Sequence, residues 1–240
     1  MEKIEEPEKP VKPVKIELPG NCFLCGEELT KTKMRNHVLK HHLSGTSGET
    51  TMFIKAEGGY QKKYWLLLDV AFSGDLGDLD WFLREIWLEC CDHCSGFRPA
   101  SHKFDFGTYE METEISELSK GLELLYSYDY GSTTELLISF LGYGVRPPQG
   151  EKVRLLARNV PLNDICVECG KPATVFCPDC YEDVNWVMKN AYYCKECGAT
   201  HNPSHEYLQS ITNSPRNGVC AYGGEQDRWK FDASKIQRIS

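Results

Sequence analysis

The sequence contains no long apolar run and no leader-like N-terminus. None of its hydrophobic segments approaches the roughly 18 residues that a membrane-spanning helix needs. The first fifteen residues, MEKIEEPEKPVKPVK, also lack the apolar stretch of a secretory signal. We therefore expect a cytoplasmic protein that makes no contact with a membrane.

Positive charge is also scarce. Lysine and arginine number 27 against 35 acidic residues, which gives a formal net charge of −8. Thiolates bound to divalent ions would bring this value to about −10. An acidic protein repels a phosphate backbone, because non-specific nucleic-acid affinity comes mainly from lysine and arginine. Any contact with nucleic acid should therefore be local.

What the sequence has in abundance is cysteine, with twelve in 240 residues. In a chain without signs of secretion, such cysteines are expected to be reduced and bound to metal. Between Ile165 and Tyr207 the candidate ligands form four pairs: Cys166 and Cys169, Cys177 and Cys180, Cys194 and Cys197, His201 and His205. Each pair supplies half of a tetrahedral zinc shell. Four halves predict two closed sites, which are typical of structural zinc.

The spacing of these pairs leaves two pairings open. Sequential pairing joins the first cysteine pair to the second, and the third to the histidines. Interleaved pairing joins the first pair to the third, and the second to the histidines. The short gaps between pairs resemble those of cross-braced zinc modules of the B-box and MYND type, which favours the interleaved arrangement.

Residues 20–44 predict a third zinc site of the C2H2 finger type. Leu29 and Met34 occupy the positions of the small finger core. The expected ligands are Cys22, Cys25, His37 and His41, with His42 as the alternative last ligand. We therefore expect three zinc ions in all.

The finger also carries four basic residues in its expected helical part. These are Lys31, Lys33, Arg35 and Lys40. They suit a local contact with nucleic acid. The alternative is a solvated face on a finger that contacts protein, because a lone finger rarely supplies enough contacts for sequence-specific DNA binding.

The rest of the chain predicts an α+β fold, with one main helix on an antiparallel sheet. Residues 1–19 form an extended tail or a partner-binding strand, and 44–61 form a linker or an edge strand. One helix is expected over 76–91, where apolar residues recur at helical spacing. Strands are expected over 63–72, 97–109, 121–130, 133–141 and 152–157. The domain ranges are 20–44, 45–160 and 161–224, followed by a C-terminal tail over 225–240.

Several residues outside these sites have reactive or ligating side chains. Cys90, Cys91, His93, Cys94 and His102 have a spacing that matches no closed site, and helix-end cysteines are often simply buried. Asp129 is either a general base or, since it precedes a turn, a turn-capping residue. A loop with Asn213, Arg216, Cys220 and Tyr222 is a second candidate; alternatively it packs against the zinc module, with Cys220 buried or serving as a ligand.

Parts of the sequence resemble a known family. The stretches LDWFLREIWLECCDHCSGF, YSYDYGSTTELLISF and RLLARN are similar to the plasmid pRiA4b ORF-3-like family, also called IS1096-element passenger proteins. Its hallmark motif is present as Tyr128-Asp129-Tyr130-Gly131, and NSPRNGVCAYGG at 213–224 continues the likeness. The resemblance covers roughly residues 60–160. It implies an α+β fold and no particular activity, and it does not include the N-terminal finger.

Closed metal sites favour a non-enzymatic function. The sequence shows no set of nucleophile, base and orienting group, and it does not indicate a small-molecule substrate. We expect a zinc-binding adaptor that presents surfaces to a protein partner. The alternatives are a nucleic-acid-binding regulator acting through the finger, and a hydrolase or nuclease of a mobile element using Asp129, His102 or Cys220.

Overall fold

The computed structural model describes most of the chain. The described residues are 18–101, 109–148, 150–180, 182–184, 187–189, 191–202, 204–205, 207–220, 222–224 and 227–236. The tail expected over 1–19 lies outside them except for its last two residues, and His102 lies outside them as well.

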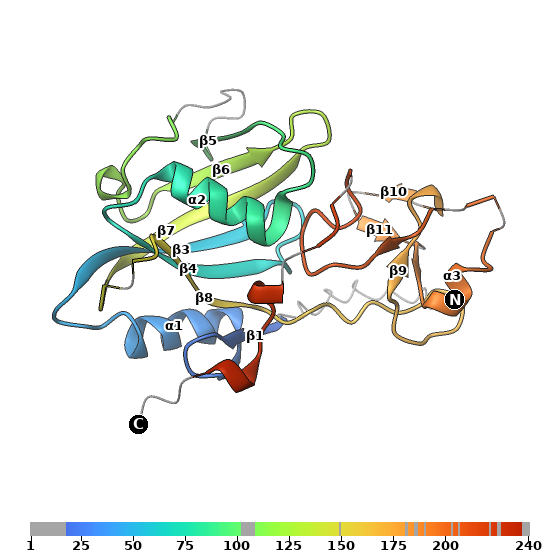
Figure 1. Ribbon diagram of the computed structural model, residues 1–240, viewed down its shortest axis with the longest axis horizontal. Coiled ribbons are helices and arrows are strands. Elements are labelled where there is room, and N and C mark those ends of the chain that lie inside the picture. The colour runs from blue at the N-terminus through green and yellow to red at the C-terminus, as the bar shows by residue number, and fades with distance from the viewer. Residues whose placement is uncertain are drawn as a thin grey trace, which may run out of the picture.

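An eight-stranded antiparallel sheet forms the larger lobe (Figure 1), with the strand order β2-β1-β8-β4-β3-β7-β6-β5. Its strands are β1 Pro19–Cys22, β2 Glu28–Thr30, β3 Glu49–Gly58, β4 Trp65–Ala71, β5 Ser95–Pro99, β6 Glu123–Tyr128, β7 Thr134–Arg146 and β8 Val153–Asn159. With few helices beside this sheet, the predicted α+β class is confirmed.

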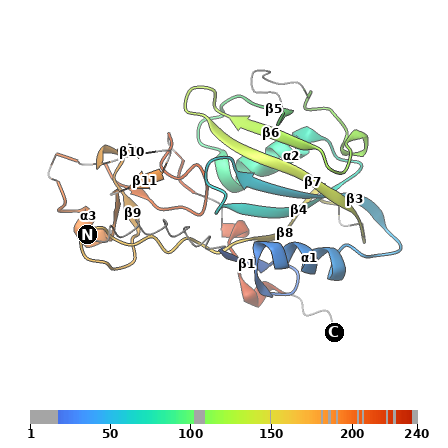
Figure 2. The same ribbon diagram turned by 180° about the vertical axis from the view of Figure 1, so that it is seen from behind.

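One helix covers each face of the sheet (Figures 1 and 2). Helix α2, Leu76–Leu83, begins at a capping box between Asp75 and Asp78 and continues as a π-helical turn, Arg84–Leu88. It packs on the main core between the helix and the sheet. Helix α1, Lys31–His41, buries Met34 and Val38 in a second core on the opposite face.

The prediction for residues 44–61 was wrong. Strand β3 is central, paired with β4 on one side and β7 on the other. Its Met52 belongs to the core beneath α2, whereas Phe53 belongs to the core beneath α1. Because both faces are buried, the strand lacks the alternation of an edge strand, and its glycine- and threonine-rich flanks suggested a linker instead.

The expected helix over 76–91 is shorter than predicted. Its last turn ends at Leu88, and Glu89 N–H donates to the carbonyl of Arg84, five residues earlier. The π-helical turn widens the helix and places Cys90 and Cys91 beyond it, where the chain reverses. Neither cysteine lies within the helix, although Cys90 still packs against the main core while Cys91 is exposed.

A smaller lobe contains the C-terminal Cys/His segment. Its elements are β9 Val175–Phe176, β10 Glu182–Val184, β11 Val187–Lys189, β12 Tyr192–Tyr193, α3 Lys195–Gly198 and β13 Gln209–Ser210. Strands β12, β9 and β13 form one small sheet, and β10 pairs with β11. The buried cluster here consists of Cys166, Cys177, Tyr193 and Cys194. Three of these are predicted ligands, so the lobe has little apolar core of its own.

The remaining short elements are single 3₁₀ turns. They are Ile115–Glu117, Pro178–Cys180, Asp227–Trp229 and Ala233–Lys235. The last two return the chain to the larger lobe, where Trp229 packs on Phe82 and Phe231 on Phe23. In the described part of the chain, no helix is both long and apolar enough to cross a membrane.

Candidate metal centres

The N-terminal finger residues converge on one point. The ligand atoms of Cys22, Cys25, His37 and His42 all lie within 4.8 Å of one another. Cys25 Sγ is 3.2 Å from His37 Nε2, and the two histidine Nε2 atoms are 3.3 Å apart. The finger is built into the large sheet, because β1 pairs with β8 as well as with β2.

His41, the preferred last ligand, does not belong to this group; its alternative, His42, does. The side chain of His41 is exposed on the last turn of α1. His42 has left the helix, with φ −127° and ψ −16°, and its Nε2 lies 3.6 Å from Cys22 Sγ. Regular helical spacing favoured the wrong histidine because the helix ends between the two.

The protonation states of this group suit a metal. Burial and the charges of neighbouring histidines lower the pKa of His42 to about 4, and burial also lowers that of His37. Both imidazoles are therefore neutral near pH 7, as metal binding requires. Burial raises the pKa of the Cys22 thiol to about 11, with Cys25 adding to the rise. A bound dication would reverse that effect and stabilise the thiolates.

The C-terminal ligands form two interleaved groups. Cys166 and Cys169 meet Cys194 and Cys197, while Cys177 and Cys180 meet His201 and His205. Cys169 Sγ is 3.7 Å from Cys194 Sγ, and His205 Nδ1 is 3.6 Å from Cys177 Sγ and 3.2 Å from Cys180 Sγ. Strands β9 and β12 are paired, which brings Cys177 beside Ala191 and the first cysteine pair beside the third.

These separations lie near the edges of a zinc tetrahedron, although Cys25 and His37, and Cys180 and His205, are closer at 3.2 Å than its sulfur–nitrogen edge. Zn–S bonds of about 2.3 Å and Zn–N bonds of about 2.05 Å place two sulfurs about 3.8 Å apart, sulfur and nitrogen about 3.6 Å, and two nitrogens about 3.3 Å. The ligand atoms therefore have the spacing of a coordination shell. The 3.7 Å between the sulfurs of Cys169 and Cys194 is also much longer than the roughly 2.05 Å of a disulfide bond.

Two further features fit a bound ion. His201 Nδ1 lies 2.6 Å from the carbonyl of Gly198, to which it donates, while its buried Nε2 has no hydrogen-bond partner. This is the usual arrangement of a metal-binding histidine, with the other nitrogen fixed by a backbone acceptor. Burial raises the pKa of Cys166, but N–H groups of Cys194, Cys169 and Glu168 outweigh it and lower the pKa to about 6. The residues present fit zinc in all three predicted sites.

The basic residues of α1 separate in the structure. Lys31 forms an ion pair with Glu57, whose carboxylate also pairs with Lys55. Lys33, Arg35 and Lys40 remain exposed. Since each helical residue turns about 100°, Arg35 lies roughly 200° from Lys33, and the three do not form one stripe.

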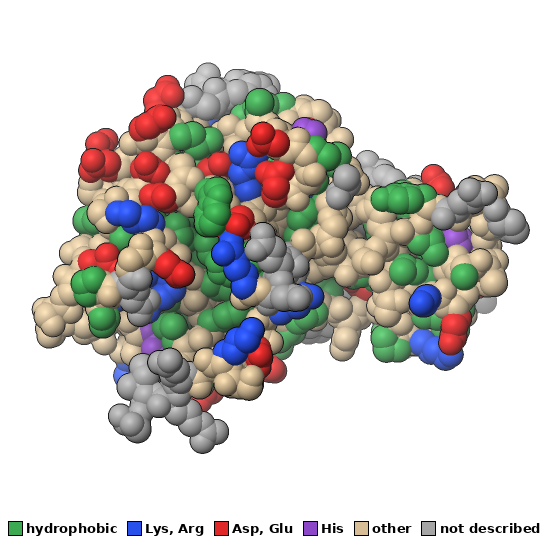
Figure 3. Space-filling view, viewed as in Figure 1, with side chains coloured by type: hydrophobic (Ala, Val, Ile, Leu, Met, Phe, Trp, Pro, Cys, Tyr) green, Lys and Arg blue, Asp and Glu red, His purple; other side chains and the backbone are tan. Residues whose placement is uncertain are grey.

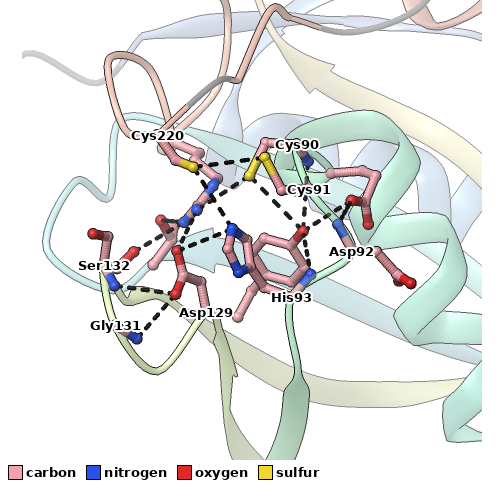
Figure 4. Close-up of polar contacts among 12 residues, drawn as sticks. Cys90, Cys91, Asp92, His93, Asp129, Gly131, Ser132 and Cys220 are labelled. Atoms are coloured by element: carbon pink, nitrogen blue, oxygen red, sulfur yellow. Dashed lines mark hydrogen bonds and ion pairs between the residues drawn. The ribbon is translucent and has the colours of Figure 1, made fainter.

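The structure brings together a fourth group that the sequence did not reveal. Cys90, Cys91 and His93 meet Cys220, with all four ligand atoms within 4.8 Å of one another. Figure 4 shows Cys220 reaching from its loop toward the other three. Cys94, one of the sequence candidates, is exposed and lies outside the group. No sequence signal links Cys220 to residues more than a hundred positions earlier.

Asp129 is a turn-capping residue engaged in an ion pair. Its Oδ1 accepts hydrogen bonds from the N–H groups of Gly131 and Ser132, and its Oδ2 lies 2.7 Å from Arg216 Nη2. Burial acts to raise the carboxyl pKa, but the Arg216 hydrogen bond and the turn N–H groups lower it to about 2. A carboxylate held in this way is a poor general base near neutral pH.

Most of the described residues in the loop over 213–222 are buried. Asn213 O accepts from Trp87 Nε1, and its side chain exchanges hydrogen bonds with Asn159. Ser214 Oγ and Tyr222 OH donate to the carbonyls of Trp87 and Ile86 at the end of the π-helical turn. The loop thus satisfies carbonyls that a helix C-terminus leaves free.

The same loop joins the two lobes. Gly218 has φ +85°, and a Cβ there would lie 2.5 Å from the ring of Phe176 in β9. Beside this contact is a cavity of about 710 Å³, between turn residues 59–61, residues 131–135, Phe176 with Pro178, and loop residues 218–220. Among the described residues that line it, Glu135 alone carries a charged side chain, and that side chain is paired with Arg98.

Comparisons with known proteins give no assignment. No family model and no curated protein matches the chain. Among the solved structures that match is a protein of unknown function from Methanosarcina mazei Go1, at 17% identity with a TM-score of 0.38. The match covers 52% of this chain and 76% of that one. A likeness of this strength identifies neither the fold nor a function.

Proposed function

We propose that the protein is a zinc-stabilised adaptor, in which structural zinc ions fix two lobes and a protein partner binds between them. The observation that carries the proposal is the set of three four-ligand Cys/His groups, each with its ligand atoms within 4.8 Å of one another. Each offers a complete shell from protein side chains, with no position reserved for water or substrate. Zinc in these sites holds the fold and takes no part in a reaction.

The partner site that the geometry favours is the cavity at the junction of the lobes. Its walls combine the apolar surfaces of Phe176, Pro178 and Val219 with backbone-rich glycine turns. Turns of this kind offer peptide groups to an extended polypeptide, and Tyr60 stands at the edge with 63% of its surface exposed. An uncharged segment of a partner protein suits this cavity, because Glu135, the one charged residue among the described lining residues, is already paired with Arg98.

The alternatives are less well supported. Among the described residues, the exposed basic side chains of α1 do not form one stripe, and Lys31 is occupied by Glu57. Acidic side chains gather at the upper left of the larger lobe in Figure 3. Along the sequence, exposed acidic residues are frequent over one stretch, at Glu110, Glu112, Glu114 and Glu117. Nucleic-acid binding by the finger stays a prediction, as does the resemblance to the pRiA4b ORF-3-like family.

One observation supports the enzyme alternative, and another counts against it. Asp129 and Cys220 do meet, since Asp129 Oδ2 and Cys220 Sγ each lie 3.6 Å from His93. Both contacts, however, are with Nε2. In a relay, the nucleophile and the carboxylate use different nitrogens of the imidazole. The geometry therefore lacks the alignment of a Cys–His–Asp triad.

An affinity purification with paired variants tests the adaptor proposal. The tagged, zinc-loaded chain is expressed in its native host, and co-purifying protein is quantified for wild type, Tyr60→Ala and Tyr143→Ala. Tyr143, 54% exposed on β7, does not line the cavity. Loss of an aromatic anchor costs about 2 kcal/mol, so Tyr60→Ala should bind roughly 30-fold more weakly.

Once the partner has been purified, its affinity for each variant can be measured directly. We expect the Kd, measured by calorimetry, to rise for Tyr60→Ala and to stay at the wild-type value for Tyr143→Ala. A photoreactive residue at position 60 should cross-link to one segment of the partner. Equal retention of the partner by both variants would place the binding surface elsewhere, and a zinc-loaded chain that binds no protein would refute the adaptor function.

A further inference from the structure

We propose that Cys90, Cys91, His93 and Cys220 form a fourth zinc site, which fastens the loop over 213–222 to the end of the π-helical turn. Nothing in the spacing of the first three predicts a site, because the fourth ligand comes from a distant loop. The proposal concerns the metal content alone and does not depend on the adaptor function.

The distances in this group are those of a coordination shell. Cys91 Sγ is 3.8 Å from Cys220 Sγ, and Cys220 Sγ is 3.6 Å from His93 Nε2. A zinc tetrahedron has edges of about 3.8 Å between sulfurs and about 3.6 Å between sulfur and nitrogen. Three thiols and one imidazole are donors that zinc prefers over magnesium or calcium.

The backbone is arranged to bring these four side chains together. Among the described residues, three that are not glycine have positive φ: Asp92 at 56°, Asp129 at 62° and Cys220 at 53°. In the sequence Asp92 lies between the ligands Cys91 and His93. The reversal of the backbone at Asp92 turns the side chains of these two ligands to the same side. Cys220 is itself a ligand. A left-handed conformation costs a non-glycine residue about 1–2 kcal/mol, and such strain persists where other contacts fix it.

A buried cation lies behind the ligand group. Arg216 Nη2 lies 3.4 Å from Cys90 Sγ and donates to it. Arg216 is fully buried and is held in place by Asp129 and by the hydroxyl of Thr134. The ion pair therefore positions a permanent cation behind the metal ligands, as outer residues of metal sites commonly do.

The fourth group is the most open of the four. Cys91 and Cys220 are exposed, and Cys90 and His93 are half-buried, whereas each of the other groups includes at least one buried ligand. Cys220 also borders the cavity between the lobes. We therefore expect zinc at this site to exchange faster than zinc at the other three.

Metal quantification with a matched control tests the site. The chain is purified under reducing conditions, loaded with Zn²⁺ and desalted, and zinc per chain is measured by elemental analysis and native mass spectrometry. We expect four zinc ions in wild type, three in Cys220→Ala and three in His93→Gln. Cys94→Ala, which removes an exposed cysteine from the same segment, should retain four. A weak chelator should withdraw one ion before the rest.

Alkylation of the wild-type protein provides a readout that no variant's folding affects. In the zinc-loaded chain, iodoacetamide should modify Cys94 well before Cys220, and chelation should remove this difference. Three outcomes would overturn the site: an unchanged zinc count in Cys220→Ala, Cys220 alkylated as fast as Cys94 with zinc present, or a Cys91–Cys220 disulfide in the reduced preparation. Rapid alkylation would favour a reactive thiol–imidazole pair instead.

Discussion

At the scale of single residues, the polar side chains that looked reactive in the sequence turn out to hold the structure together. Arg216 is fully buried and bridges the Asp129 turn, the backbone of Ser132 and the Cys90 sulfur. Asn213 links β8 to the π-helical turn that follows α2 in the same manner. A buried charge or amide costs free energy unless it is paired, so these residues are constrained by their partners.

Breaking the Asp129–Arg216 pair should destabilise the fold strongly. Asp129→Asn leaves a buried guanidinium without its counter-charge, which typically costs about 3–5 kcal/mol. Urea unfolding of the zinc-loaded chain, followed by tryptophan fluorescence, measures the change in unfolding free energy. The control is Lys171→Met, which removes an ion pair with Glu196 whose side chains are 64% and 78% exposed. That pair should contribute less than about 1 kcal/mol. Equal losses in both variants would contradict the structural role of Asp129.

At the scale of elements, the finger is part of the sheet. Strand β1 pairs with β8, and α1 covers a sheet face through Met34 and Val38. The candidate zinc ligands His37, within α1, and His42, directly after it, are therefore held by an element whose position is already fixed by apolar packing. Preorganisation of this kind lets the metal be bound without first ordering the chain.

Substitution of the two neighbouring histidines separates the candidate ligands. His42→Ala should lower the zinc content by one ion per chain, because it removes the candidate metal-binding atom Nε2, which lies 3.3 Å from His37 Nε2. His41→Ala is the matched control and should leave the content unchanged, since its exposed side chain lies outside the group. Elemental analysis of both purified variants gives the answer. Zinc loss in His41→Ala alone would reverse the assignment.

At the scale of the whole molecule, the two lobes depend on metal to different degrees. The larger lobe has an extended apolar core under α2 and a second one under α1. The smaller lobe has a buried cluster made largely of its own ligands. Lobes with so little core are usually stable only when metal or disulfides hold them.

Removal of zinc should therefore unfold one lobe before the other. With a strong chelator, hydrogen exchange should lose protection in β9 and β12, while β3, β4 and β7 keep theirs. Mass spectrometry of peptides from each strand makes the comparison, and added zinc should restore protection. Simultaneous loss in both lobes would show that the metal sites support the large sheet as well.

The sequence by itself determined the local chemistry. The paired cysteines and histidines predicted the ligand sets at both ends, because two ligands on one turn or one helix are fixed by neighbouring residues. Apolar patterns likewise predicted the start of α2 and the strands β4, β6, β7 and β8, whereas β5 ends at Pro99, short of the strand expected over 97–109, and β9 to β13 were not predicted. The interleaved pairing was favoured from gap lengths alone, and the paired strands β9 and β12 account for it.

What only the tertiary structure decided are the contacts between distant segments. The choice of His42 depended on where α1 ends, and the central place of β3 depended on cores that bury both of its faces. The meeting of Cys220 with Cys90, Cys91 and His93 required the loop to dock on the π-helical turn. Such contacts join residues far apart in the chain, so they follow from packing and leave no spacing pattern in the sequence.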